Sequence, residues 1–251
     1  MNTHTPMSID VSSLERATVA AVAPAHVEEL AGWLLAFDAG TVNRARSAVP
    51  LSHDAPDASV VAAIFGRYRE RGVMSNFRIA QKASMAAVET ALARQGLRPR
   101  QPTQVLVAQA RDVPAADGGP RVQIAVEPDD EWAAVFLGEG FDPADGASRV
   151  ATLKRAQGSL FASVREGERV VAAGVLAMSH GWASVHGMRT ALSHRRRGLA
   201  TCVLATFARE AQRRGYERIA LQVEVANDAA TRVYTQCGFT HAWTYAYWRK
   251  Q

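Results

Sequence analysis

The chain has 251 residues, 48% of them hydrophobic and 21% charged, a composition typical of globular proteins that bury a core. Its net charge of +5 fits an anionic partner, a phosphorylated cofactor or an arginine-rich surface, so charge alone identifies no partner. No apolar run approaches the roughly 18 residues of a membrane span, no signal peptide is recognisable, and the two cysteines lack metal-ligand spacing. We therefore expect a cytoplasmic protein with no membrane role and no metal.

A segment rich in proline and glycine at residues 113–120 divides the chain. It lacks hydrophobic periodicity and concentrates residues that break helices and strands, which is typical of a linker. The sequence therefore predicts one domain at residues 1–112 and a second at residues 121–251.

The N-terminal half is expected to alternate strands and helices. Ser13 is a candidate cap for a first short helix. The expected elements then follow as strands at 33–37 and 42–49, a helix at 58–71, a strand at 76–79, a helix at 84–95 and a strand at 104–109.

The C-terminal half repeats this alternation of strands and helices, with additional elements at its beginning. Its clearest element is a helix beginning near Ala200, whose apolar residues recur at i, i+3 and i+4 until Gly215 ends it. The other expected elements are strands at 122–126, 159–166, 170–178, 183–191, 219–225 and 243–248, and helices at 129–137, 143–156 and 227–237. In the last strand, Trp243, Tyr245, Tyr247 and Trp248 are expected to pack in the sheet rather than to form an aromatic substrate cage.

Two pairs of helix-ending glycines indicate an internal duplication. Gly72 and Gly96 are 24 residues apart, and Gly215 and Gly238 are 23 apart, so the two segments superpose at an offset of 142 or 143 residues. Helices often end in glycine, so the spacing alone leaves coincidence open. The matching order of elements favours a structural duplication.

The candidate chemistry begins at a basic loop between a strand and the helix near Ala200. Its residues are Arg195, Arg196, Arg197, Gly198, Leu199 and Ala200. A helix start leaves backbone N–H groups unpaired at the positive end of the dipole, and small residues let that backbone close around a pyrophosphate. The alternative is a basic turn that only begins an amphipathic helix.

A second pattern lies 29 residues beyond Gly198, where Asn227 begins a helix and Ala230 and Tyr234 follow on the same face. Asn227 also fits a purely structural role as the helix N-cap, and Tyr234 fits a core position. The residues alone leave these alternatives open.

Together the two patterns resemble the GNAT superfamily of N-acetyltransferases. Its motif A is the Gln/Arg-x-x-Gly-x-Gly/Ala loop after the fourth strand, and its motif B is similar to Val-x-x-x-Asn-x-x-Ala-x-x-x-Tyr-x-x-x-Gly-Phe at residues 223–239. The resemblance covers residues 120–251 and implies an α/β (α+β) fold with a mixed central sheet flanked by helices. Leu192 replaces a proline common in relatives, which leaves the loop intact.

The first half adds to this resemblance. Residues 32–35, Arg44 and Arg46 are similar to bacterial tandem GNAT proteins, whose first half is degenerate. This implies a smaller, half-GNAT-like α/β domain before the catalytic one. Under the duplication, Asn227 and Tyr234 correspond to Met85 and Leu92. Arg195, Gly198 and Ala200 correspond to Ser52, Ala55 and Asp57, where the acidic charge would repel a pyrophosphate. We therefore expect the first half to bind no CoA and to wall the substrate cleft or support the fold.

The resemblance implies that acetyl-CoA lies across the strand at 183–191. Its pantetheine arm would bond to the backbone near Met188 and Thr190, and its pyrophosphate to the amides from Arg196 to Thr201. Asn227, Ala230 and Tyr234 complete the expected cofactor contacts.

The family's reaction is a direct attack of an amine on the thioester in a ternary complex. Tyr234 would give a proton to the departing thiolate, and a backbone N–H such as that of Thr190 would hold the oxyanion. Glu224, His186 and ordered water are all candidate routes for the amine's proton. Glu224 fits a solvated charge equally well, and His186 a satisfied sheet histidine.

The sequence does not identify the acceptor, and small-molecule amines and peptides are both candidates. A homodimer is also possible. No helix-turn-helix or single-strand-binding pattern supports nucleic acid as a partner. A catalytically weak CoA sensor or regulator that keeps the fold is the alternative to an enzyme.

Overall fold

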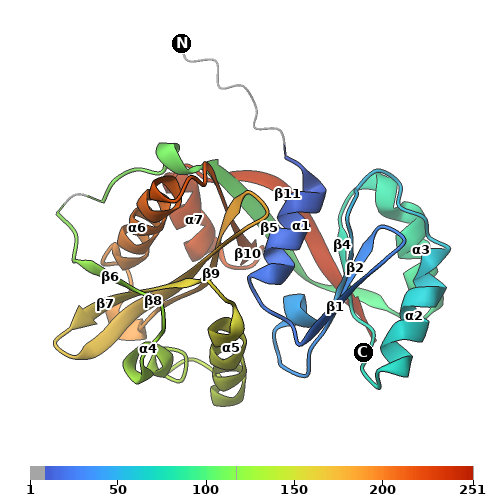
Figure 1. The fold of residues 1–251 in the computed structure, drawn as a ribbon, viewed down its shortest axis with the longest axis horizontal. Coiled ribbons are helices and arrows are strands. Elements are labelled where there is room, and N and C mark those ends of the chain that lie inside the picture. Colours follow the sequence, from blue (N-terminus) through green and yellow to red (C-terminus); the bar gives the residue numbers. More distant parts are fainter. Residues whose placement is uncertain (1–8, 117, 251) are drawn as a thin grey trace, which may run out of the picture.

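One sheet of eleven strands runs through the part of the chain that the computed structural model describes, residues 9–116 and 118–250 (Figure 1). The strands are β1 (His26–Leu30), β2 (Trp33–Phe37), β3 (Ala48–Pro50), β4 (Phe77–Ala80), β5 (Arg98–Gln109), β6 (Val122–Ala125), β7 (Leu160–Glu166), β8 (Arg169–Ser179), β9 (Trp182–Thr190), β10 (Arg218–Glu224) and β11 (Thr240–Arg249). The helices are α1 (Val11–Ala20), α2 (Val60–Glu70), α3 (Ala86–Arg94), α4 (Asp130–Ala134), α5 (Pro143–Arg155), α6 (Leu199–Arg213) and α7 (Asp228–Gln236).

The duplication predicted from the glycine spacing is present in the topology. The order β3-α2-β4-α3-β5 recurs as β9-α6-β10-α7-β11, and β3 pairs with β4 in parallel, as β9 does with β10. Gly72 and Gly215 end the corresponding helices α2 and α6 with φ of +67° and +80°. Residues other than glycine adopt that conformation at a cost, which explains why the repeat is visible in these residues.

The two halves exchange their last strands. The strand order is β1-β2-β3-β4-β11-β5-β10-β9-β8-β7-β6, so β11 lies between β4 and β5 of the N-terminal half. In turn, β5 pairs along β10 of the C-terminal half, from Arg218 opposite Gln109 to Glu224 opposite Thr103. Both strands cross the middle of the molecule (Figure 1). The division at 113–120 stays a prediction, and residue 117 lies outside the described residues.

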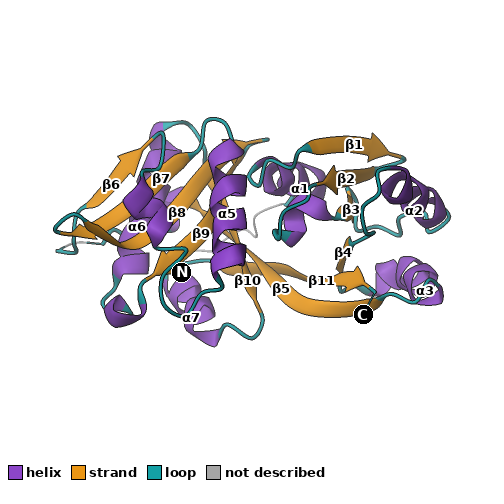
Figure 2. Ribbon diagram, turned by 90° about the horizontal axis from the view of Figure 1, so that it is seen from below, coloured by secondary structure: helices purple, strands orange, loops and turns teal. Residues whose placement is uncertain are grey.

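Helices cover both faces of the C-terminal half of the sheet. Helices α6 and α7 lie on one face, and α4 and α5 on the other (Figures 1 and 2). The predicted apolar stripe of α6, including Val203 and Phe207, is buried with Leu221 of β10. On the opposite face, Phe136 and Leu153 form a smaller core with Phe161 of β7.

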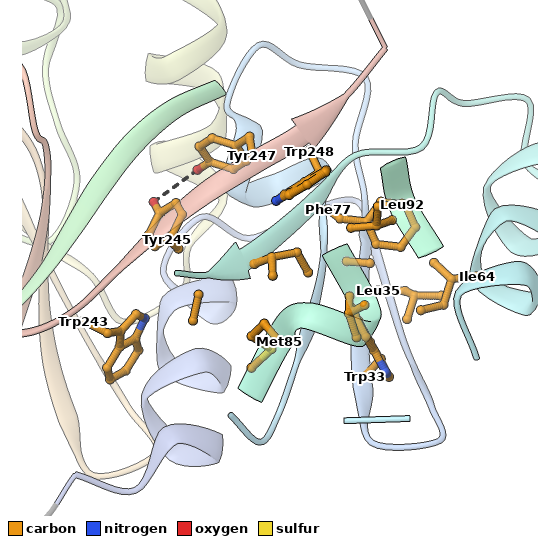
Figure 3. Close-up of a cluster of buried hydrophobic side chains, with 14 of the residues drawn as sticks. Trp33, Leu35, Ile64, Phe77, Met85, Leu92, Trp243, Tyr245, Tyr247 and Trp248 are labelled. Atoms are coloured by element: carbon orange, nitrogen blue, oxygen red, sulfur yellow. Dashed lines mark hydrogen bonds between the residues drawn. The ribbon is translucent and has the colours of Figure 1, made fainter. Parts of the chain in front are cut away.

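The N-terminal half closes its core around side chains from β11. Trp243, Tyr245, Tyr247 and Trp248 are all buried in one cluster with residues such as Phe77 (Figure 3). Burying a large side chain contributes on the order of 1.5–3 kcal/mol, so the exchanged strand is a main source of stability for this half. The expectation that these aromatics pack in the sheet is confirmed, and Tyr245 and Tyr247 also line a cavity.

Three local expectations are wrong. Asp10, not Ser13, caps α1, because its side chain accepts a hydrogen bond from Ser12 N at 3.0 Å. The strand expected at 42–49 is instead a 3-10 helix at Asn43–Arg46 followed by the short β3. Strand β1 was not expected, because its sequence His-Val-Glu-Glu-Leu is that of a largely exposed edge strand without a clear apolar face. The shorter 3-10 helices are Ala83–Met85, Ala110–Asp112 and Leu192–His194.

Candidate functional site

Strands β9 and β10 separate toward their carboxyl ends. Their parallel pairing ends at Val185 opposite Leu221, although β9 continues to Thr190 and β10 to Glu224. The cause is a bulge in β9, where the register with β8 shifts between Arg189 and His186. Gly187 sits in this bulge with φ of +58°, and a Cβ there would lie 2.9 Å from Leu153 Cδ1. The positive φ and the nearby Leu153 side chain therefore both favour glycine where the strands part.

A cavity of about 310 Å³ fills the gap between the two strands. It brings together five of the predicted site residues: His186, Met188, Glu224, Asn227 and Tyr234. Its lining also comes from the N-terminal half, through Val22, Val42, Asn43, Arg44, Gln101 and Thr103. The first half thus walls the cleft, one of the two roles expected of it.

Hydrogen bonds fasten this N-terminal wall to the C-terminal half. Thr41 donates from its hydroxyl to Asp145 Oδ1 at 2.7 Å and from its backbone N–H to Ser148 Oγ at 2.8 Å, both on α5. Arg155, also on α5, forms an ion pair with Asp38. Hydrogen bonds and an ion pair therefore hold α5 against the N-terminal half at one side of the cleft.

Tyr234 lines the cavity from α7. Its side chain is 8% exposed and its ring lies edge-on to Phe239, with centroids 6.3 Å apart. Within the described residues, its hydroxyl has no hydrogen-bond partner, so it is available to a ligand. Burial raises the pKa of Tyr234 to about 12, so the phenol is protonated at neutral pH and is a potential proton donor.

The two candidate bases differ in their surroundings. Glu224 is exposed at the end of β10, and its Oε1 accepts a hydrogen bond from Gln101 Nε2 at 2.6 Å. His186 is buried, and its Nε2 has no hydrogen-bond partner in the described chain. Burial, aided by the charge of Arg44, holds the pKa of His186 well below its usual value. An imidazolium is therefore unfavourable at that position.

The free edge of β9 offers backbone hydrogen bonds to a ligand. Ala191 N–H donates to Val171 O at 2.9 Å, and Thr190 stands opposite Ala172. Because bonded and non-bonded pairs alternate in an antiparallel ladder, the N–H and C=O of Thr190 point away from β8, toward the open side. Met188 lies inside the bulge, where this alternation is interrupted, and it lines the cavity. These are the two positions where the sequence places the pantetheine contacts.

The basic loop leads directly into α6 as expected. Gly198 is the N-cap residue with φ of +72°, and the space where its Cβ would stand is empty. Arg196 also has a positive φ, of +62°. Arg197 and His194 both contact Glu166, at 2.7 and 2.9 Å, which fixes the loop against β7. The first N–H groups of α6, near Leu199, Ala200 and Thr201, have no partner within the helix and suit an anion.

The Asn227 side chain caps α7, since its Oδ1 accepts a hydrogen bond from Ala230 N at 3.1 Å. Asn227 is thus the N-cap of α7, the structural role that the sequence left open, and it also lines the cavity. Ala230 packs against the core beneath α7 and, like Thr190, does not line the cavity.

The corresponding positions of the N-terminal half have other roles. Met85 and Leu92, the counterparts of Asn227 and Tyr234, are fully buried in the core (Figure 3). Asp57 accepts hydrogen bonds from the backbone and side chain of Ser59, which lower the pKa of its carboxyl. An aspartate held in its charged form does not favour a phosphate.

Several cavity residues were not identified from the sequence. They are Arg149 and Arg189 of the C-terminal half, Gln222 of β10, Gln101 and Thr103 of β5, and Tyr245 and Tyr247 of β11. Gln222 connects the elements, since its Oε1 accepts from Arg44 Nη1 at 3.2 Å and from the Tyr245 hydroxyl at 2.8 Å. The strand exchange brings most of these residues together, and no local pattern in the sequence marks it.

Residues 9–116 and 118–250 hold neither a membrane-spanning helix nor a cluster of metal-binding side chains. No helix there has both the length and the hydropathy to cross a bilayer. No group of three or more His, Cys, Asp or Glu side chains there is arranged to hold a metal ion.

Comparisons with solved structures agree with this geometry. A GCN5-related N-acetyltransferase from Kribbella flavida aligns with a TM-score of 0.68 at 17% identity, covering 96% of this chain and 95% of that one. A tandem GNAT protein from the clavulanic acid biosynthesis pathway aligns with a TM-score of 0.61 at 12% identity, covering 95% and 94%. At these identities the likeness shows the fold, which is the GNAT fold in its tandem form.

Sequence comparisons identify the family. The uncharacterized N-acetyltransferase YsnE of Bacillus subtilis (strain 168) is 34% identical over 91 residues, which are 34% of this chain and 59% of that protein. The chain thus spans less than two thirds of that relative. A family model described as probable histone acetyltransferase Rv0428c, C-terminal, matches residues 8–248. The chain therefore belongs to this acetyltransferase family, within the GNAT acyltransferases.

Proposed function

We propose that the protein is an N-acetyltransferase that transfers an acetyl group from acetyl-CoA to a primary amine in a ternary complex. One observation carries the proposal: the cavity between the separated ends of β9 and β10 holds the free hydroxyl of Tyr234 and adjoins the strand that leads to the α6 loop. This arrangement pairs a slot for an extended thioester arm with a proton donor.

The chain's own residues fit acetyl-CoA. Gly198 leaves open space at the positive end of α6, where Arg195, Arg196 and Arg197 are exposed, and this suits a pyrophosphate. The Thr190 N–H, which faces away from β8, suits a carbonyl of the pantetheine arm, and Met188 lines the cavity beside it. When bound there, acetyl-CoA would supply an activated acetyl thioester.

In the proposed reaction, the amine nitrogen attacks the carbonyl carbon of the acetyl group and the carbon–sulfur bond breaks. The Thr190 N–H is proposed to hold the oxyanion that forms. Tyr234 gives its hydroxyl proton to the leaving thiolate, a role supported by its position in the cavity wall and by burial, which keeps the phenol protonated.

Glu224 is the proposed base for the amine. It is exposed, it lines the cavity, and Gln101 donates a hydrogen bond to its carboxylate. His186 is the weaker candidate, because the low pKa imposed by burial makes its protonated form unfavourable. Ordered water beside Glu224 is the proposed relay where the amine does not reach the carboxylate directly.

The N-terminal half is proposed to bind no CoA and to form the acceptor wall. This is supported by the buried Met85 and Leu92 and by the charged Asp57 at the counterpart positions. Small-molecule and peptide amines both remain candidate acceptors, and a homodimer stays a prediction.

A thiol-release assay with acetyl-CoA and a panel of amines tests the proposal, using Tyr234→Phe as the diagnostic variant. We expect kcat to fall about 10²- to 10⁴-fold, while the KM for acetyl-CoA changes little, because only the proton donor is lost. The matched control is Tyr216→Phe, at the far end of α6 and outside the cavity. CoA binding without turnover of any amine would favour the sensor, and absence of CoA binding would refute both.

A further inference from the structure

The walls of the cavity carry an excess of positive charge. Arg44, Arg149 and Arg189 all line it, whereas Glu224 is the sole carboxylate among the described lining residues. His186 adds no charge at neutral pH, since burial keeps its pKa low. A site for a purely cationic amine would be expected to carry an excess of negative charge instead.

Two of the three guanidinium groups lack a carboxylate partner within residues 9–116 and 118–250. Arg149 is paired, since its Nε lies 2.6 Å from Asp145 Oδ2. Arg44 donates only to the neutral Gln222, and its buried Nε has no hydrogen-bond partner. Arg189 stacks over Phe141, with 4.3 Å between the guanidinium carbon and the ring centroid. Asp145 and Glu224 act on Arg189 without forming an ion pair with it, so a directly bound anion would further offset the cost of desolvating these guanidinium groups.

Arg44 and Arg189 lie outside the α6 loop, although the charge of Arg195 in that loop acts on Arg189. A Cβ on Gly174 would touch Met188, Val203 and Phe207, so Met188 is on the face of β9 that α6 covers. Arg189 lies on the opposite face, over Phe136 and Phe141 near α4 and α5. Arg44 comes from the N-terminal wall, on the 3-10 helix Asn43–Arg46. Arg44 and Arg189 are therefore not part of the proposed phosphate loop and can contact a second anionic group in the cavity.

We propose, on the basis of the acetyltransferase function above, that the acceptor is a small amine that carries its own carboxylate, as a free amino acid does. Its amino group lies at Glu224, and its carboxylate is bound by Arg44 and Arg189. Arginine matches a carboxylate through paired hydrogen bonds, and a cavity of about 310 Å³ suits a small molecule. Histones, named in the family's description, have lysine-rich tails. The positive charges of such a tail would be repelled by the arginines of this cavity wall.

The experiment compares kcat/KM for free amino acids, for the same amino acids as C-terminal amides, and for a lysine-rich peptide. We expect loss of the carboxylate to lower kcat/KM about tenfold or more, the usual effect of losing a charged hydrogen bond. Arg44→Gln should abolish the preference for acid over amide, and Arg44→Lys should restore part of it. The matched control is Arg94→Gln, an exposed arginine of α3 outside the cavity.

Amides or the lysine-rich peptide acetylated as fast as the free amino acids would overturn this inference and leave the acetyltransferase function standing. If no amine is acetylated, the proposed function fails instead, and calorimetry with CoA present decides the inference. Tighter binding of the acid than of the amide, lost in Arg44→Gln, would support it. Equal binding, or none, would overturn it.

Discussion

A buried ion pair between α1 and β4 gives a quantitative test of how the N-terminal half is held together. Glu15 Oε2 and Arg78 Nη1 are 2.5 Å apart, and each residue is 1% exposed. The guanidinium also lies 5.2 Å from the ring centroid of Tyr245, on the exchanged strand β11. Replacing one partner would leave the other charge buried and uncompensated.

The expected cost of Glu15→Leu is about 3–5 kcal/mol of unfolding free energy, the usual effect of breaking a buried pair. For a chain of this size, with about 2–4 °C per kcal/mol, this is a fall in Tm of roughly 6–20 °C. Arg78→Met should cost less. Burial raises the pKa of the Glu15 carboxyl, which can take up a proton, whereas a guanidinium cannot lose its own. The double variant should regain most of the loss, because apolar residues of similar volume often replace such pairs well.

Urea unfolding of the wild type, the two single variants and the double variant measures these values as a double-mutant cycle. Glu210→Ala is the control, since its ion pairs with Arg213 and Arg214 lie on the exposed surface of α6, and we expect stability near that of the wild type. Additive costs in the double variant would refute the reasoning, because they would mean that the two charges do not depend on one another.

Two further predictions concern His53 and Gly187. Burial, with Lys82 and Arg78 nearby, lowers the pKa of His53 from 6.5 to about 4, so stability should be full above pH 6.5 and fall by about 3 kcal/mol as pH drops to 4. Urea unfolding at pH 6.5 and pH 4 measures this difference in unfolding free energy, and it should be smaller in His53→Gln than in the wild type. The same pH dependence in both proteins would show that His53 is not its source. Gly187→Ala should cost about 1–3 kcal/mol in unfolding and weaken acetyl-CoA binding in calorimetry, because its φ is positive and Leu153 occupies the space. Wild-type affinity in that variant would mean that the bulge does not shape the cofactor slot.

The features that sequence predicted well are those with a local physical cause. Helix α6 has a regular apolar stripe, and Gly215 supplies its end, so its position follows from residues close together in the chain. The loop at Gly198 and the cap at Asn227 are likewise local. Five candidate site residues meet in the cavity because β9, β10 and α7 are consecutive elements of one repeat.

The features that sequence did not predict depend on pairing between distant segments. Arg44 lies 178 positions before Gln222, to which it donates a hydrogen bond, and only the position of β5 beside β10 brings the two halves so close. The stretch expected as a strand at 42–49 has β-branched and apolar residues, but part of it forms the cavity wall as a 3-10 helix. Tertiary contacts override local preference at both places.

Because β5 and β11 are exchanged, the two halves of the chain cannot be separated without exposing strand edges. A cut between residues 113 and 120 would yield two fragments, each holding the strand that completes its neighbour's sheet. Each fragment alone would expose unpaired strand edges, which favour aggregation or pairing with a second copy. The chain is thus the covalent counterpart of a domain-swapped dimer, and neither half is a portable module.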